Sequence, residues 1–141
     1  MRCVRLGCGA GYSGDRLEPA VELAERGDLD YLVFECLAER RLALANLAKL
    51  QEPTKWYAPG LEARMRAVLQ PCRRRGTRII TNMGAANPTE AGCILRRIAS
   101  DLRLRGLRVA VILGDDILAR ARSREVPLLP PGCLEGLGDA L

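Results

Sequence analysis

Polar residues and glycines follow each of four apolar segments in this sequence, and these residue types can bind a phosphate, a metal ion or a carbonyl oxygen. The glycine-rich stretch 9–15 follows the first segment, and Glu35, Asn82 and the pair Asp115 and Asp116 follow the next three. In open parallel α/β sheets, ligands bind beyond the carboxyl ends of the strands. If the four segments are parallel strands, we expect these residues to gather at one edge of the sheet.

The stretch Gly9-x-Gly11-x-x-Gly14 has the spacing of a dinucleotide-binding loop between a strand and a helix. Glycines let the backbone approach a phosphate, and the amides of a helix N-terminus donate hydrogen bonds to it. We therefore expect Gly9, Gly11, Ser13 and Gly14 to contact a phosphate. Asp15 competes for the same donors, and a tight turn that needs a positive φ explains the glycines equally well.

Glu35 and two asparagines complete the expected ligand contacts. Glu35 ends the second apolar segment, near the position of a ribose-binding acid, and is expected to contact a ribose or to act as a general base. Asn82 is expected to donate to a carbonyl or phosphate oxygen. Asn87 is also a candidate ligand contact, although its place before Pro88 and Glu90 is typical of the N-cap of a helix.

Asp115 and Asp116 are the candidate metal ligands and, together with Glu35, the candidate catalytic carboxylates. Carboxylate oxygens bind Mg²⁺, particularly where a phosphate or thioester oxygen shares the ion. The competing interpretation is that one aspartate caps the next helix while the other is solvated.

A repeating strand–helix order predicts the elements that position these residues. We expect strands at 4–8, 31–36, 78–82 and 108–113, helices at 15–26, 38–50 and 61–75, and a further helix that starts at Asn87 and stops at Gly106. This alternation is typical of parallel strands joined by right-handed crossovers. The prediction is a three-layer α/β fold with a doubly wound, Rossmann-like, mostly parallel sheet of about four strands. A partial (β/α) barrel is the alternative. The α/β domain should span residues 1–118, with a loose tail at 119–141.

The composition excludes several classes of function. The chain has 141 residues, which suits one domain, and a net charge of +5. It has no histidine, which excludes Ser-His-Asp and Cys-His catalysis within the chain. Six cysteines without a CxxC pair argue against a zinc site, and arginines without interleaved aromatic residues argue against nucleic-acid binding. Without a secretory leader or an apolar run near the ~20 residues of a membrane span, we expect a cytoplasmic protein with no membrane partner.

Four sequence blocks together resemble a known family. They are GCGAGYSGDR at 7–16, DYLVFECLAE at 30–39, TNMGAANP at 81–88 and GDD at 114–116. In this order and spacing they resemble the N-terminal portion of the acyclic terpene utilisation (AtuA-type) family, over about residues 2–118. The resemblance implies a role in the bacterial breakdown of citronellol- and geraniol-like terpenoids, a pathway that runs through CoA thioesters.

Three hypotheses about function follow from the motifs and the resemblance. The first is a domain that binds a small phosphate-bearing ligand, a CoA thioester or a nucleotide, with Mg²⁺ as a candidate ion. The second is an NAD(P)-dependent oxidoreductase. The third rests on the family domains, which continue beyond Asp116 with further strands and helices. We therefore expect this chain to lack a C-terminal portion. A truncated, non-catalytic assembly domain would favour homo-oligomers, because an incompletely flanked sheet leaves apolar surface to cover.

Overall fold

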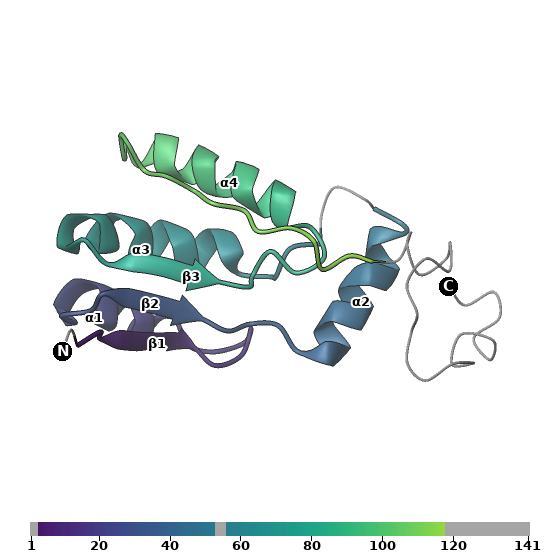
Figure 1. Ribbon diagram of the computed structural model, residues 1–141, viewed down its shortest axis with the longest axis horizontal. Coiled ribbons are helices and arrows are strands. Elements are labelled where there is room, and N and C mark those ends of the chain that lie inside the picture. The colour runs from purple at the N-terminus through teal and green to yellow at the C-terminus, as the bar shows by residue number, and fades with distance from the viewer. Residues whose placement is uncertain (1–2, 53–55, 118–141) are drawn as a thin grey trace. The chain divides into compact units, whose positions relative to one another are not determined.

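The computed structural model describes residues 3–52 and 56–117 of the chain (Figure 1). Met1–Val111 forms one compact unit and Ile112–Leu141 belongs to a second. All helices and strands of the described residues lie in the first unit. The predicted tail at 119–141 and its boundary at residue 118 lie outside the described residues.

The sheet is open and parallel, as predicted for an α/β fold. Its strands are β1 (Leu6–Ala10), β2 (Tyr31–Phe34) and β3 (Arg78–Thr81), in the order β1-β2-β3. In the register, Val33 pairs with Cys8 on one side and with Ile80 on the other. All three strands therefore end at the same edge of the sheet, where their following loops meet (Figure 1).

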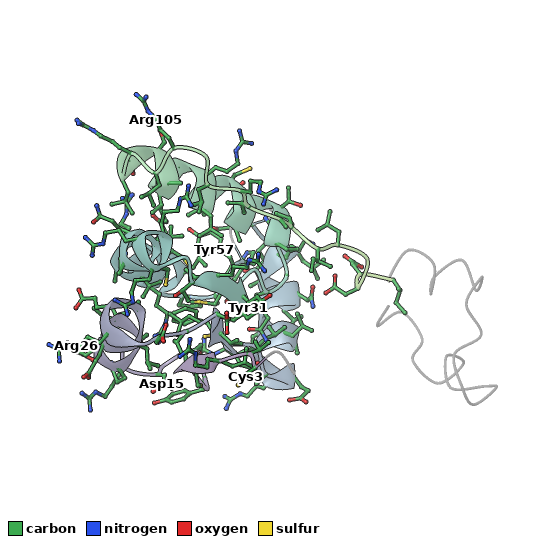
Figure 2. The ribbon with its side chains drawn as sticks, turned by 60° about the vertical axis from the view of Figure 1, so that its left-hand side comes forward. Cys3, Asp15, Arg26, Tyr31, Tyr57 and Arg105 are labelled. Carbon is green, nitrogen blue, oxygen red and sulfur yellow. The ribbon has the colours of Figure 1, made fainter. Side chains whose placement is uncertain are left out.

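Three helices lie in a row, and two of them contact the sheet. They are α1 (Glu18–Arg26), α3 (Leu61–Arg75) and α4 (Pro88–Asp101), with α3 in contact with both others. Figure 2 shows Arg26 of α1 and Arg105 beyond α4 at opposite edges of this row. The fourth helix, α2 (Glu39–Lys49), has no buried residue and lies beyond the carboxyl ends of the strands. None of the helices in the described ranges is long and apolar enough to cross a membrane.

The core forms between one face of the sheet and these helices, because side chains alternate between the two faces of a strand. Leu32 and Phe34 of β2 are fully buried and join a cluster with Met65 and Val68 of α3. On the alternate positions the strands present apolar side chains to solvent, and Leu6 is 66% exposed. Consecutive apolar residues, such as those at 31–34, are typical of a strand buried on both faces, whereas the described residues bury only one face of β2.

The predicted strand at 108–113 is wrong: residues 107–117 contain neither helix nor strand. The segment 107–111 instead runs alongside α4 (Figure 1). Val111 Cγ2 lies only 2.5 Å from the position that a Cβ at Gly92 would take, so this glycine of α4 makes room for the valine. Leu107 is half-buried against the core. Apolar contacts with α4 thus replace the hydrogen bonds of a strand.

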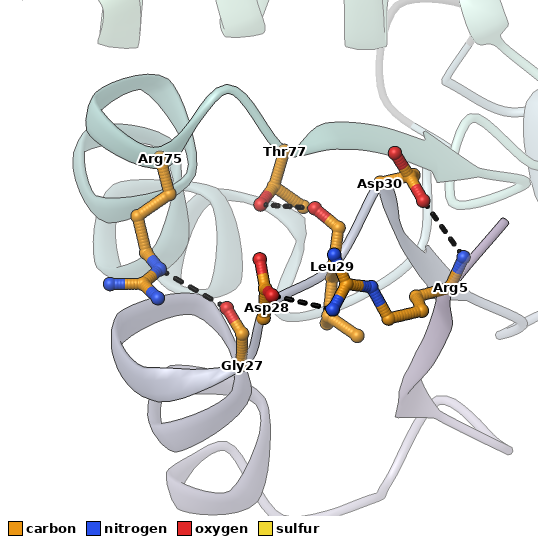
Figure 3. A network of polar contacts seen from close by, with 7 residues as sticks. All are labelled: Arg5, Gly27, Asp28, Leu29, Asp30, Arg75 and Thr77. Carbon is orange, nitrogen blue, oxygen red and sulfur yellow. Dashed lines mark hydrogen bonds and ion pairs between the residues drawn. The ribbon is translucent and has the colours of Figure 1, made fainter. Parts of the chain in front are cut away.

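Polar contacts fix the amino ends of the strands, opposite the expected site (Figure 3). The Arg5 guanidinium pairs with Asp28 at 2.5 Å, and the Arg5 amide donates to Asp30 Oδ2 at 2.8 Å. Thr77 Oγ1 donates to the carbonyl oxygen of Leu29 at 3.0 Å. These bonds join the start of β1, the turn before β2 and the turn before β3. The acidic residues at this end of the sheet therefore have structural partners.

Candidate functional site

Glu35 and Asn82 meet at the carboxyl ends of β2 and β3. Asn82 Nδ2 donates to Glu35 Oε1 at 2.9 Å, and Asn82 Oδ1 accepts from the Cys36 amide at 2.8 Å. The Leu37 amide donates to the same Glu35 oxygen at 3.0 Å. Both side chains are exposed. Two residues predicted from separate motifs thus form one solvent-facing pair, held by main-chain amides of the segment after β2.

The loop after β1 closes on its own carboxylate. Asp15 Oδ2 accepts from the Gly11 amide at 3.0 Å, and Asp15 Oδ1 accepts from the Arg16 amide at 2.9 Å. These two bonds are the main reason that the pKa of Asp15 lies below its ordinary value, and the nearby charges of Arg64 and Arg16 lower this pKa further. The carboxylate therefore occupies amides that a phosphate on this loop would use.

The predicted helix start at Asp15 is wrong. The helix α1 begins at Glu18, and its N-cap, Leu17, makes no side-chain capping bond. Asp15 cannot serve as the cap because both of its oxygens are bonded to the loop that precedes the helix.

Packing accounts for Gly9, which lies within β1. A Cβ at Gly9 would lie 2.7 Å from the Phe34 ring, so only glycine fits beneath this core side chain. At Gly11 the nearest atom to such a Cβ is Asp15 Oδ2 at 4.0 Å, which leaves open space. Gly9, Gly11 and Gly14 all lie outside the left-handed region, so the positive-φ explanation for these glycines is wrong. The role of the loop in binding phosphate stays a prediction.

Arg64 is the residue of this region that sequence reasoning missed. It projects from α3 with only 5% of its surface exposed. Its guanidinium donates to the main-chain carbonyl oxygens of Ser13, Asp15 and Arg16, the first and last at 3.4 Å. A buried charge is stabilised only where such partners are present. The position of Arg64 three residues after Leu61, on the apolar stripe of α3, was the signal that could have revealed it.

Cys36 directly follows Glu35, and several of these charged groups influence its thiol. Its thiol is buried, and burial is the main cause that raises its pKa. Arg64 opposes this rise, whereas the carboxylates of Glu35 and Asp15 add to it. Burial therefore favours the protonated form of the Cys36 thiol, as is typical of a cysteine that packs in the core.

Asn87 caps α4 as the Asn-Pro-Thr-Glu order predicted. Its side chain accepts from the Glu90 amide at 3.2 Å, and Pro88 occupies the first helical position. The side-chain oxygen of Asn87 is thus bonded at the start of the helix. Its contact with a ligand stays a prediction.

Asp115 and Asp116 are exposed and belong to the second unit, whereas Glu35 and Asn82 belong to the first. Across the described ranges, no three His, Cys, Asp or Glu side chains come together as a metal site. The magnesium and catalytic roles of these two aspartates stay predictions.

The fold and the site define an α/β protein with a polar cluster at the carboxyl ends of parallel strands, the usual place for a small-molecule site. Residues 4–128 match the profile of the acyclic terpene utilisation family protein AtuA. Because this match covers most of the chain, the protein belongs to that family. No curated protein and no solved structure matches the chain.

Proposed function

We propose that this chain binds a CoA thioester, or another phosphate-bearing ligand of terpenoid breakdown, at the carboxyl ends of β1, β2 and β3. The observation that carries the proposal is the exposed Glu35–Asn82 pair, in which side chains from the ends of two strands meet at 2.9 Å. The loop closed by Asp15 follows β1 and lies at the same edge of the sheet. Membership of the acyclic terpene utilisation family supplies the metabolic context.

The hydrogen-bonding capacity of the pair suits a carbonyl and a hydroxyl group. An amide nitrogen carries two hydrogens, so Asn82 Nδ2 can donate to a thioester carbonyl or phosphate oxygen while it stays bonded to Glu35. Glu35 Oε1 accepts from both Asn82 and Leu37, which leaves Oε2 to accept a ribose hydroxyl or a proton. Both residues are exposed, so a ligand can reach their side chains.

In this proposal, the glycine-rich stretch that contains Gly9, Gly11, Ser13 and Gly14 binds the phosphate. The Asp15 carboxylate already holds the Gly11 amide, so a phosphate must compete with it there. Replacing this carboxylate by an amide removes the repulsion between two anions. Asp15→Asn is therefore expected to tighten binding of free CoA severalfold, and equal or weaker binding would contradict a phosphate contact with the loop.

Thermal unfolding of the purified chain tests the proposal as a whole, with geranyl-CoA, free CoA, NADH and Mg²⁺ added separately. A ligand at one hundred times its Kd adds about 2.7 kcal/mol, which raises the Tm of a domain this size by several degrees. We expect this rise with geranyl-CoA, and its loss in Glu35→Gln and Asn82→Ala. Glu25→Gln and Asn46→Ala, on exposed faces of α1 and α2, are the matched controls.

Each other outcome of this experiment points to one of the remaining hypotheses. A rise with NADH alone would favour the oxidoreductase. A chain indifferent to all four additions would contradict the proposal and favour the assembly domain, whose self-association sedimentation measures. A rise with Mg²⁺ that is lost in Asp115→Asn would support the predicted metal role of that residue.

A further inference from the structure

A groove lies along the C-terminal part of α4 and the segment that follows it, away from the Glu35–Asn82 pair. We call it the α4 groove. Three arginines and three apolar residues characterise its lining: Arg96, Arg103, Arg105, Leu104, Leu107 and Val109. Figure 2 shows Arg105 at the α4 edge of the helical row.

The charges in the α4 groove are all positive. No acidic residue lines it, and among the described residues Arg96, Arg103 and Arg105 form no ion pair. The neighbouring carboxylate of Asp101 is bound to Arg66 at 2.8 Å. Like charges that lie close together repel unless an anion joins them. The electrostatic complement of this surface is therefore an anionic group.

Arg103 adds a second observation, because its backbone adopts a conformation that favours glycine. Its φ is 54°, in the left-handed region, at the position directly after the end of α4. The Arg103 amide donates to Ser100 at 2.9 Å and the Leu104 amide donates to Ala99 at 2.8 Å, the pair of bonds that ends a helix in a Schellman motif. Glycine is the usual residue at that position. Arg103 lines the groove at the expense of local stability, as strained residues at functional sites do.

Apolar side chains form the rest of the surface. Leu104 and Leu107 are half-buried against the core, which fixes their position, and Val109 is also half-buried. Apolar contact surface beside guanidinium groups suits a molecule that has a hydrocarbon chain and one anionic end.

We propose that the α4 groove binds an amphipathic anion, a small molecule with a hydrocarbon chain that ends in a carboxylate or phosphate. The guanidinium groups of Arg103 and Arg105 bind the anionic end, and the chain lies on Leu104 and Leu107. This site is independent of the Glu35–Asn82 pair and of the ligand proposed there.

Calorimetric titration of the full chain tests this site, with octanoate as the probe and with acetate and octylamine as its separated halves. We expect saturable binding of octanoate and at least about tenfold weaker binding of acetate and octylamine. Arg103→Gly and Arg105→Gln are each expected to weaken octanoate binding about fivefold, as the loss of one partly exposed ion pair predicts. Arg26→Gln, which removes a charge from the end of α1 instead, should leave it unchanged.

The variant Arg103→Gly separates binding from folding. Glycine relieves the strain at φ 54°, so this variant should melt at the same or a higher temperature while it binds octanoate more weakly. Unchanged octanoate affinity in Arg103→Gly would overturn the proposal. So would acetate binding as tight as that of octanoate, which would indicate a simple anion site. Binding to phosphatidylglycerol vesicles without binding to octanoate would overturn it in favour of a lipid surface.

Discussion

Arg64 donates a hydrogen bond to the main-chain carbonyl oxygen of Asp15, and so a buried guanidinium of α3 holds the loop that follows β1. The same loop is closed from within by the Asp15 carboxylate on the Gly11 amide. One side chain therefore binds the carbonyl groups of the loop and another binds its amides. This arrangement fixes one wall of the proposed site before any ligand arrives.

Replacing Arg64 by methionine should destabilise the protein by about 2–3 kcal/mol, because it leaves main-chain carbonyl oxygens without their charged donor. Urea unfolding measures this loss. The control is Arg66→Met on the same helix, which removes an exposed ion pair with Asp101 and should change stability by less than about 1 kcal/mol. Equal losses in both variants would show that Arg64 does not hold the loop.

The Asp15 carboxylate should make stability depend on pH in the acid range. Amide hydrogen bonds from Gly11 and Arg16 hold its pKa below the ordinary value of 3.8. A lowered pKa means that the charged form stabilises the fold at pH above 3.8, and that this contribution is lost as the pH falls through the lowered value. Urea unfolding of the protein and of Asp15→Asn should therefore differ at neutral pH and converge in acid. A difference that grows in acid would contradict this sign.

The same substitution should destabilise the protein at Gly9 and have little effect at Gly11. Gly9→Ala places a methyl group against the Phe34 ring and should cost about 1–3 kcal/mol. Gly11→Ala enters open space and should change stability by no more than about 0.5 kcal/mol. Thermal melts of the two variants test this pair. Equal effects would show that the Gly9 position is not set by the packing of Phe34.

Thiol reactivity should follow burial. Cys3, Cys8 and Cys93 are exposed, whereas Cys36 and Cys72 are buried, and burial raises the pKa of Cys72 to about 11. Alkylation of the native protein at mildly alkaline pH, mapped by mass spectrometry, should modify the three exposed residues and spare the two buried ones. In urea all six cysteines of the chain should react. Rapid native modification of Cys36 would contradict its assignment as a core thiol.

The elements that the sequence predicted well are those whose signal is local. The apolar stripe from Leu61 to Cys72 predicted α3, and the Asn87-Pro88 start predicted α4 together with its cap. The expectation that polar residues gather at the ends of the strands is confirmed for Glu35 and Asn82, which are hydrogen-bonded to each other. The two helices were predictable because residues a few positions apart determine them. The Glu35–Asn82 pair was predictable because parallel strands end at the same edge of a sheet.

The features that escaped prediction depend on contacts distant in sequence. The segment 108–113 has the β-branched composition of a strand, yet it does not pair with the edge strand β3, and Val111 packs on Gly92 of α4 instead. Asp15 has the type and spacing of a helix cap, but the Gly11 amide competes for its oxygen. In the sequence Arg64 resembles a solvated helix residue. In the structure its guanidinium donates to the loop of Ser13, which is distant in sequence.

The most direct test of the strand-end site is a titration of the isotope-labelled chain with geranyl-CoA, followed by amide resonances. We predict saturable shifts centred on the amides of Gly11, Arg16, Cys36 and Leu37, which hold the side chains of Asp15, Asn82 and Glu35. Shifts confined to the α4 groove, or no saturable shift at all, would contradict a ligand site at the carboxyl ends of the strands.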